Sequence, residues 1–494
     1  MLISGLALGA VLGFVMQRGR FCVTGFLRDI FTQRSWRGFV SLLIVISVHA
    51  IGLAALTSAG VITPEYNELA PLAVIVGGVI FGLGIVLAGG CASGTWYRSG
   101  EGLIGSWIAL VFYALSAAAM KTGFLNGLQD SLKERTVGLT SIHASLGISI
   151  WPLVIALSAV TAYFAVRFLR EEFSGPRPAT LAPRKSGLAH ILTEKAWHVY
   201  ATAAIVGVLG VIAWPLSAAT GRNDGLGITT PSSNLANYVV TGDTERFDWG
   251  VLLVLGILVG SFIAAKASGE FRLRVPDATQ GARSVVGGIF MGVGAAWAGG
   301  CTVGNGMVQT SLFSYQGWLA LASIAAGVAI AAKLWLKPSA PSLNDVPSTP
   351  STTNDTAVSA TSPVTSTATS PVSLPGSEGA GAAGTEASPL AGAFAVAPVA
   401  LLDRSVVKQE DGKLTPLGDG RYELDTVGAV CPFPLIEAKD AINKIEVGEE
   451  LVIPFDCTQA TDAIPRWAAK DGHKVTNFEQ TSEAGWTISV RRGK

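Results

Sequence analysis

Residues 77–94 read Gly-Gly-Val-Ile-Phe-Gly-Leu-Gly-Ile-Val-Leu-Ala-Gly-Gly-Cys-Ala-Ser-Gly, and residues 287–304 read Gly-Gly-Ile-Phe-Met-Gly-Val-Gly-Ala-Ala-Trp-Ala-Gly-Gly-Cys-Thr-Val-Gly. The two stretches lie 210 positions apart and share six glycines, an alanine, the cysteine and the glycine after it. Chance rarely aligns nine such positions, so the chain contains an internal repeat. Each copy is an apolar run interrupted by a Gly-Gly pair, which is typical of a helix broken inside a membrane.

The composition favours a membrane protein over a soluble enzyme. Of the 494 residues, 49% are hydrophobic and 14% are charged, against about 25% charged residues in soluble domains. Lys plus Arg and Asp plus Glu both number 35, so a basic excess that would point to nucleic acid is missing. We expect no cofactor and no metal. Nine apolar runs predict nine spans, at about 2–16, 38–60, 71–89, 103–120, 150–168, 198–218, 249–266, 284–298 and 317–336.

The zero net charge is the sum of three unequal regions. Residues 1–337 carry a net charge of +8, residues 338–397 carry −4 and residues 398–494 carry −4. The middle region is rich in Pro, Ser, Thr, Ala and Gly and cannot bury enough apolar surface to offset its ordering entropy, so we predict a disordered linker. The chain is therefore predicted to hold a polytopic α-helical membrane domain, a linker and a small soluble domain.

The flanks of the apolar runs predict the orientation. With the N-terminus outside, the inward loops carry sixteen Lys and Arg residues and the outward loops carry five. We therefore expect the cytoplasmic (inner) membrane, with the C-terminal domain in the cytoplasm. Because five spans separate the two Gly-Gly-Cys copies, the copies run in opposite directions. This predicts an inverted repeat with re-entrant segments, in which Gly89, Gly90, Gly299 and Gly300 turn the backbone beside a substrate path.

Three of the five cysteines lie in the predicted membrane domain. An odd and small number of cysteines favours free thiols over a disulfide framework. A membrane thiol is often only a small buried residue, but the shared Gly-Gly-Cys context favours a role for Cys91 and Cys301. Cys22, in the sequence Gln-Arg-Gly-Arg-Phe-Cys, leaves both interpretations open. No Lys or Arg is expected inside the core spans, and Arg18 and Arg20 are either cytoplasmic anchors or exit-site contacts for an anion.

The last region has an ordinary soluble composition. Strands at 421–427, 451–455, 474–479 and 486–490, with helices at 432–445 and 458–470, predict a β-α-β-α-β-β two-layer α/β domain. Cys431 precedes the first helix in Cys-Pro-Phe-Pro, where the helix dipole favours a thiolate that can carry sulfur. Cys457 is predicted to lie at a loop–helix junction with no essential role.

These motifs resemble two known families. Residues 1–337 resemble the YeeE/YedE family of thiosulfate uptake proteins through Gln-Arg-Gly-Arg-Phe-Cys22, Ala-Gly-Gly-Cys91-Ala-Ser-Gly-Thr and Ala-Gly-Gly-Cys301-Thr-Val-Gly-Asn. Residues 419–494 are similar to the YeeD/TusA sulfur carriers through Cys431-Pro-Phe-Pro and the order of elements. The resemblance implies that the three membrane thiols line a thiosulfate path and that Cys431 handles the sulfur. It gives no role to Cys457, because many carriers have another residue there.

The sequence therefore predicts thiosulfate uptake across the lipid bilayer, with the sulfur then handled by the fused cytoplasmic domain. Cys431 is a candidate thiosulfate-decomposing sulfurtransferase nucleophile that forms a persulfide and passes sulfur to a downstream protein or thiol. Two alternatives stay open: transport of another sulfur- or selenium-containing anion, and a sulfurtransferase that the spans merely anchor. The repeat argues against an anchor, because an anchor needs no site inside the bilayer.

Overall fold

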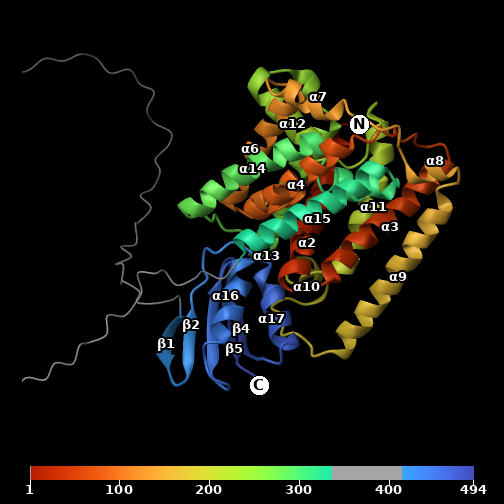
Figure 1. The fold of residues 1–494 in the computed structure, drawn as a ribbon. Coiled ribbons are helices and arrows are strands. Elements are labelled where there is room, and N and C mark those ends of the chain that lie inside the picture. Colours follow the sequence, from red (N-terminus) through yellow and green to blue (C-terminus); the bar gives the residue numbers. More distant parts are fainter. Residues whose placement is uncertain (1, 337–413, 494) are drawn as a thin grey trace, which may run out of the picture. The chain divides into compact units, whose positions relative to one another are not determined.

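The described part of the chain has two regions, an N-terminal region built from helices and a smaller C-terminal region built around a β-sheet (Figure 1). The computed structural model describes residues 2–336 and 414–493. The predicted linker at 338–397 lies outside the described residues, as does the start of the predicted soluble domain at 398–413. The described residues of both regions belong to one compact unit.

The membrane region is built from helices of very unequal length. The bounds of its described helices are α1 Ile3–Arg18, α2 Val23–Thr32, α3 Arg37–Ser58, α4 Pro71–Leu87, α5 Ala92–Gly100, α6 Ile104–Lys121, α7 Asn126–Lys133, α8 Ile142–Leu146, α9 Trp151–Ser174, α10 Gly187–Thr193, α11 Val199–Ala218, α12 Thr229–Thr241, the 3₁₀ helix η1 Thr244–Arg246, α13 Trp249–Ser268, α14 Ala278–Ala298, the π-helix η2 Gly304–Gln309 and α15 Tyr315–Trp335. The short elements α5 and η2 follow the two Gly-Gly-Cys motifs directly.

Eight described helical stretches are long and apolar enough to cross a membrane, which confirms a polytopic helical membrane domain. They are Ile3–Thr32, Arg37–Ser58, Pro71–Gly100, Ile104–Lys121, Trp151–Ser174, Val199–Ala218, Trp249–Ser268 and Tyr315–Trp335. Eight of the nine predicted spans overlap these stretches. The other, at 284–298, lies in α14, which has 21 residues but is not among the eight. The total of nine spans stays a prediction.

Four glycines of the repeat allow α4 and α14 to pack backbone against backbone. A Cβ atom on Gly77 would lie 2.7 Å from the Gly294 carbonyl oxygen, and one on Gly84 would lie 2.8 Å from the Gly287 carbonyl oxygen. The contacts are reciprocal, because Cβ atoms on Gly294 and Gly287 would lie 2.6 and 2.9 Å from the Gly77 and Gly84 oxygens. Side chains do not fit at these distances, so the glycine spacing of the repeat serves close helix packing.

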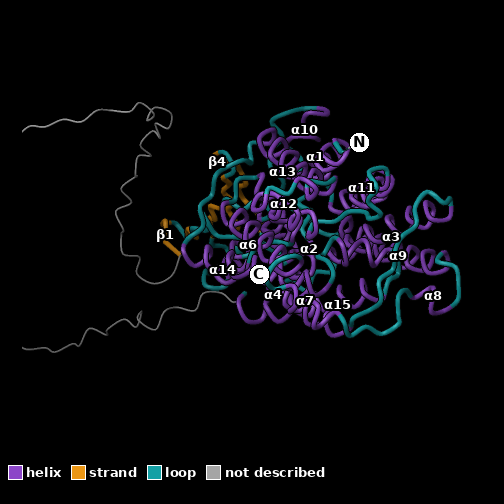
Figure 2. The backbone as a smooth tube through the Cα atoms, turned by 90° about the horizontal axis from the view of Figure 1, so that it is seen from above, coloured by secondary structure: helices purple, strands orange, loops and turns teal. Residues whose placement is uncertain are grey.

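The soluble domain holds one five-stranded sheet with the order β1-β2-β3-β5-β4. Strands are drawn in orange in Figure 2. Its elements are β1 Leu414–Gly418, β2 Arg421–Leu424, α16 Phe433–Ile442, β3 Glu450–Phe455, α17 Ala460–Lys470, β4 Lys474–Ser482 and β5 Gly485–Arg491. The predicted β-α-β-α-β-β order is confirmed. The structure adds β1, which pairs antiparallel with β2 and extends the sheet by one strand. Strands β2 and β3 are the parallel pair.

Helices α1 and α13 also pack through glycine. A Cβ atom on Gly9 would collide with the carbonyl oxygen of Leu253, and one on Gly256 would collide with that of Leu6. The obstructing atoms belong to the backbone, so a rotamer change cannot relieve the clash. This packing positions the end of α1, where the segment that carries Cys22 begins.

We expect Gly9→Ala to lower the thermal stability of the detergent-solubilised protein, because the added methyl group forces the two helices apart at a cost of about 1–3 kcal/mol. Gly127→Ala is the matched control, since a Cβ atom at this exposed position of α7 meets nothing within 4 Å. Thermal unfolding of both variants is compared with the unsubstituted chain. Equal midpoints for Gly9→Ala and the unsubstituted chain would contradict the tight α1–α13 contact.

Candidate functional site

Both Gly-Gly-Cys motifs end a long helix and turn the chain. Helix α4 ends at Leu87, and Gly89 follows with φ of +72°. Helix α14 ends at Ala298, and Gly299 follows with φ of +78°. Residues with a Cβ atom rarely adopt this left-handed conformation, so glycine is required at both turns. The two breaks have the same backbone geometry at equivalent positions of the repeat.

Cys91 and Cys301 begin the segment after each break with the same kind of hydrogen bond. The Gly94 amide donates to Cys91 Sγ at 3.3 Å, and the Val303 amide donates to Cys301 Sγ at 3.4 Å. Cys91 is the N-cap residue of α5. Both thiols are almost completely buried, with exposed fractions of 0% and 1%. Equivalent positions of the repeat therefore hold equivalent buried thiols.

Cys22 joins this arrangement from a different part of the chain. It is the N-cap residue of α2 and is buried. A Cβ atom on Gly94 would lie 3.2 Å from Cys91 Sγ and 3.7 Å from Cys22 Sγ, so both sulfurs converge on one glycine.

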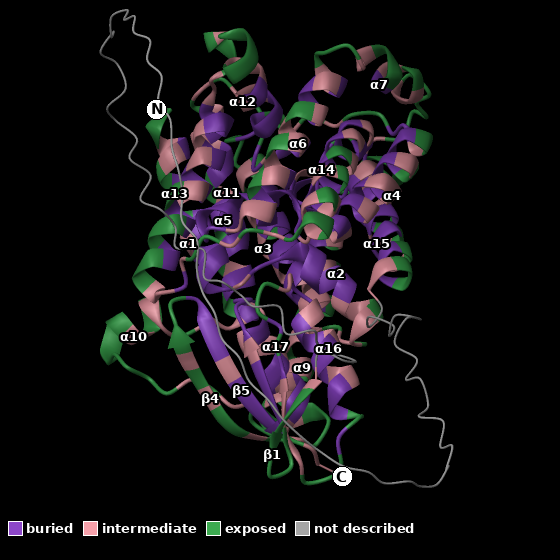
Figure 3. Ribbon diagram, turned by 90° about the vertical axis from the view of Figure 1, so that its left-hand side faces the viewer, coloured by how far each residue is buried: buried purple, intermediate pink, exposed green. Residues whose placement is uncertain are grey.

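Arg98 is one of the sixteen basic residues predicted to lie in the inward loops. In the structure it belongs to α5, in which all nine residues are buried (Figure 3). Its guanidinium group donates to the Gly89 carbonyl oxygen and to Cys22 Sγ, the latter at 3.8 Å. In residues 2–336 and 414–493, no carboxylate forms an ion pair with Arg98. Arg98 also lies inside the candidate span Pro71–Gly100, so the expectation that no Lys or Arg lies inside the core spans is wrong.

The expectation of five free thiols is also wrong. Cys431 and Cys457 form a disulfide, with their Cα atoms 6.2 Å apart, whereas Cys22, Cys91 and Cys301 are free. The disulfide forms because β2 and β3 are parallel neighbours, so the loops that follow them start from the same edge of the sheet.

Two hydrogen bonds hold these loops of the soluble domain together. The Thr426 amide donates to the Pro454 carbonyl oxygen at 3.1 Å, and the Gly428 amide donates to Asp456 Oδ1 at 3.0 Å. One contact lies shortly after β2 and the other next to Cys457. The loops are thus aligned along their length, which places Cys457 opposite Cys431.

The loop of Cys431 contacts the membrane helices next to the break after α4. Arg28 of α2 donates to the Cys431 carbonyl oxygen at 3.4 Å. A Cβ atom on Gly89 would lie 3.0 Å from Val430 Cγ1. A pocket at this contact is lined by Gly89, Gln280, Arg283, Trp335, Val430 and Cys431, among others. The thiol-bearing loop of the soluble domain and the first Gly-Gly-Cys motif therefore face one small pocket.

Alternating charges join helix α17 to the ends of α3 and α9. Glu172 accepts from Arg466 at 2.7 Å and from Arg37 at 3.2 Å. Arg466 also pairs with Asp462 at 2.8 Å, and Arg37 lies 3.9 Å from the same carboxylate. Single exposed ion pairs contribute little, but a network that shares partners orients two surfaces. These contacts align the soluble domain with the membrane helices.

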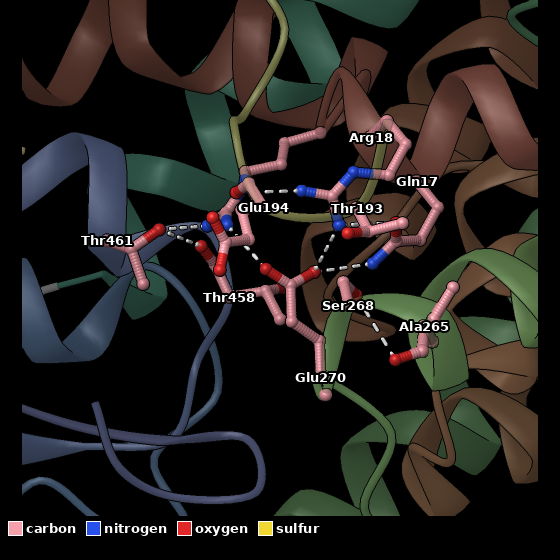
Figure 4. A network of polar contacts seen from close by, with 12 residues as sticks. Gln17, Arg18, Thr193, Glu194, Ala265, Ser268, Glu270, Thr458 and Thr461 are labelled. Atoms are coloured by element: carbon pink, nitrogen blue, oxygen red, sulfur yellow. Dashed lines mark hydrogen bonds and ion pairs between the residues drawn. The ribbon is translucent and has the colours of Figure 1, made fainter. Parts of the chain in front are cut away.

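A second network surrounds the buried carboxylate of Glu270 (Figure 4). It accepts from Gln17 at 2.6 Å, Arg20 at 2.9 Å and Arg18 at 3.3 Å, while Arg20 also donates to Thr461 of α17. Burial alone would raise the pKa of Glu270, but Arg20 and Arg18 hold it below its ordinary value. Both arginines are thus paired with a buried carboxylate, and the two roles considered for them stay predictions.

The fold and these residues define a helical membrane protein that carries buried thiols and a fused thiol-bearing α/β domain. Residues 18–330 match the family "Sulphur transport", and residues 422–492 match the family "Sulfurtransferase TusA". The chain therefore belongs to the sulphur-transport family and ends in a TusA-type domain. This confirms the resemblance found from the cysteine motifs.

Named relatives cover each part of the chain. Over 328 residues the chain is 51% identical to the thiosulfate transporter TsuA of Escherichia coli (strain K12), which spans 66% of this chain and 93% of the relative. It is 32% identical over 337 residues to TsuA of Spirochaeta thermophila, spanning 65% and 94%. Over 70 residues it is 57% identical to the putative sulfur carrier protein TsuB of Escherichia coli, spanning 14% of this chain and 93% of the relative.

Glu101 is a buried acid next to this site. It is 2% exposed and follows α5 directly, with Arg274, Glu270 and Arg98 nearby. Burial raises the pKa of Glu101 to about 7, and Arg274 and Arg98 only partly oppose the shift. The folded protein therefore holds this proton up to a higher pH than the unfolded chain, which releases it near pH ~4.3.

We expect Glu101→Gln to stabilise the protein at pH 8. Between the two pKa values the folded state binds more protons than the unfolded state, so the Glu101 contribution to stability falls as pH rises. The gain from Glu101→Gln should be about 2–3 kcal/mol larger at pH 8 than at pH 5. Thermal unfolding at both pH values measures it, with the exposed Glu134→Gln as control. A loss of stability that grows with pH would show instead that Glu101 is ionised and paired.

Proposed function

We propose that this protein takes up thiosulfate through Cys301, Cys91 and Cys22 in turn and delivers it to Cys431. The observation that carries the proposal is the buried Arg98 guanidinium group, which contacts Cys22 Sγ and has no carboxylate partner among the described residues. A buried cation that no carboxylate contacts directly is costly. A dianion that passes the thiols would supply the opposite charge at this point of the path.

The chemistry of thiosulfate suits a row of thiols. Its terminal sulfur is soft and large, and a neutral thiol donates only a weak S–H hydrogen bond. Weak sites in series let an ion leave each one as easily as it enters. Arg98 compensates one of the two charges beside Cys22, which favours arrival without trapping the ion. The thiosulfate transporters among the relatives support this choice of substrate.

The repeat suggests how the path is built. We infer that its two copies are related by a two-fold axis and are inverted across the bilayer. The reciprocal contacts of Gly77 with Gly294 and of Gly84 with Gly287 support this, because a two-fold axis exchanges such pairs. In this arrangement each Gly-Gly-Cys motif is re-entrant, and one thiol of each copy lines the path.

We also infer that the soluble domain lies in the cytoplasm. Arg20, Arg28, Arg37 and Arg274 belong to the loops that the charge bias predicts to face inward. All four contact the soluble domain, through Thr461, Cys431, Asp462 and Asp456 respectively. The positive loops and the acidic soluble domain thus meet on one side, which supports an outward N-terminus and an inner-membrane location.

The reaction of thiosulfate with Cys431 would offset the free-energy cost of importing an anion into a negative interior. Against a negative interior, each charge costs about 2.3 kcal/mol per 100 mV, and thiosulfate carries two. When Cys431 is reduced, its thiolate attacks the outer sulfur of thiosulfate, the S–S bond breaks, and sulfite leaves with the electron pair. The persulfide on Cys431 cannot return through the path. Covalent fusion keeps this thiol near the exit at an effective concentration of the order of mM.

We expect Cys91→Ala and Cys301→Ala to abolish growth on thiosulfate as the sole sulfur source, because each removes one site of the row. The test uses cells that lack other thiosulfate uptake, and growth on cysteine is the control for expression and viability. Normal growth of both variants on thiosulfate would rule out a path along these thiols. Competition of labelled thiosulfate uptake by sulfate, sulfite and selenite separates this substrate from a related anion.

Arg98→Gln should lower thiosulfate uptake at least about tenfold, because it removes the cationic group that contacts Cys22 Sγ while a side-chain amide can still donate to the Gly89 carbonyl oxygen. Arg98→Lys should retain part of the uptake. The control is Arg167→Gln, which removes a half-exposed charge from α9. Uptake into whole cells is compared with the thermal stability of each variant. If Arg98→Gln transported normally, the proposed counter-charge would have no function.

A further inference from the structure

The disulfide between Cys431 and Cys457 brings a second thiol to the place where the proposed sulfur chemistry occurs. Neither the sequence motifs nor the family resemblance assigns a role to Cys457. In the structure both cysteines are nearly buried, with exposed fractions of 7% and 8%. We propose that Cys457 is the resolving thiol, which attacks the persulfide on Cys431 and releases its outer sulfur as sulfide. This inference rests on the proposed attack of Cys431 on thiosulfate.

The geometry of the sheet makes the pair possible. Cys431 precedes α16 and Cys457 precedes α17, and the two helices follow the parallel neighbours β2 and β3. A Cα–Cα distance of 6.2 Å lies within the range that a disulfide spans without backbone movement. The thiol of Cys457 can therefore reach the sulfur bound to Cys431 while the domain keeps its fold.

Two arginines of the membrane region donate hydrogen bonds to the loops that carry Cys431 and Cys457. Arg28 donates to the carbonyl oxygen of Cys431, and Arg274 donates to that of Asp456, directly before Cys457. Positive charge near a cysteine favours its thiolate, which is the nucleophile in both steps. The contact surface of the soluble domain thus presents two cysteines to the exit, each beside a membrane arginine.

The proposed step balances without a further redox partner. The Cys457 thiolate attacks Cys431 Sγ and forms the Cys431–Cys457 disulfide. The bond between Cys431 Sγ and the outer sulfur breaks, and the outer sulfur leaves with the electron pair as hydrosulfide after taking up the thiol proton. The two thiols are oxidised by two electrons, and the zero-valent outer sulfur is reduced to sulfide by the same two.

Repeated turnover then requires a dithiol reductant of the cytoplasm, which reduces the disulfide and restores both thiols. Over both steps, thiosulfate and two thiols become sulfite, sulfide and a disulfide. The disulfide of the structure is the spent form of this cycle. The protein would therefore release sulfur as sulfide, and a persulfide would be its intermediate and not its product.

The test is a single turnover of the full chain purified in detergent. The protein is reduced, freed of reductant, mixed with excess thiosulfate and quenched with iodoacetamide; sulfite, sulfide and the intact mass of the chain are measured. For the unsubstituted chain we expect sulfite and sulfide in about equal amounts and the Cys431–Cys457 disulfide. For Cys457→Ser we expect the same sulfite burst, at least about tenfold less sulfide, and a chain one sulfur atom heavier.

The sulfite burst separates the possible failures. It shows that Cys457→Ser is folded and that Cys431 still reacts, so a loss of sulfide alone assigns the resolving step to Cys457. Sulfide release by Cys457→Ser at the unsubstituted level would overturn the inference and leave the attack by Cys431 intact. The absence of sulfite from the unsubstituted chain would overturn both. Cys431→Ser should form neither product.

Discussion

The hydrogen bond from Arg98 to the Gly89 carbonyl oxygen lies where the break after α4, a membrane thiol and the soluble domain meet. A helix break in an apolar environment exposes backbone groups that water cannot reach, and each must find a partner. Arg98 supplies one, because α5 brings it back over the turn that Gly89 makes. The same guanidinium group reaches Cys22, and Gly89 lies beside Val430 of the soluble domain. The break, the thiols and the domain contact thus share one cation.

The glycines of the repeat divide into two groups with different physical roles. Gly77, Gly84, Gly287 and Gly294 lack side chains because α4 and α14 touch there. Gly89 and Gly299 lack them because the chain adopts positive φ. One repeated motif therefore encodes both the contact of its two copies and the turn that precedes a buried thiol. This explains why the glycine spacing and the Gly-Gly-Cys ending recur together.

Much of this organisation could be predicted from the sequence, since it depends on local patterns. Apolar runs predict helices such as α3 and α13, and alternating apolar residues predict strands such as β3 and β5. The family resemblance followed from short motifs around Cys22, Cys91, Cys301 and Cys431. What the sequence could not show depends on tertiary packing.

Arg98 is the main example of a residue that sequence patterns misplace. Hydropathy distinguishes apolar from polar segments, but it cannot distinguish a polar helix enclosed by protein from a loop in water. The segment Trp-Tyr-Arg-Ser-Gly after Cys91 therefore looked like an inward loop, although all of α5 is buried. Its helical spacing was the available signal, because Arg98 lies two turns after Cys91 and so on the same face.

The pairing of Cys431 with Cys457 depends on strand order, which composition does not encode. The two cysteines are 26 residues apart, and they meet because β3 lies beside β2 in the sheet.

The disulfide-bonded cysteines lie in the soluble domain and the free cysteines lie in the membrane region. The three membrane thiols are free, and an ion that follows the proposed path must leave them unchanged. Covalent chemistry needs a nucleophile and a second group to release its product, and the described residues bring two cysteines together for a disulfide only in the soluble domain. In the proposed function, transfer and reaction thus belong to different domains, and Arg28 connects them, because it lies on the helix that Cys22 begins and contacts the backbone of Cys431.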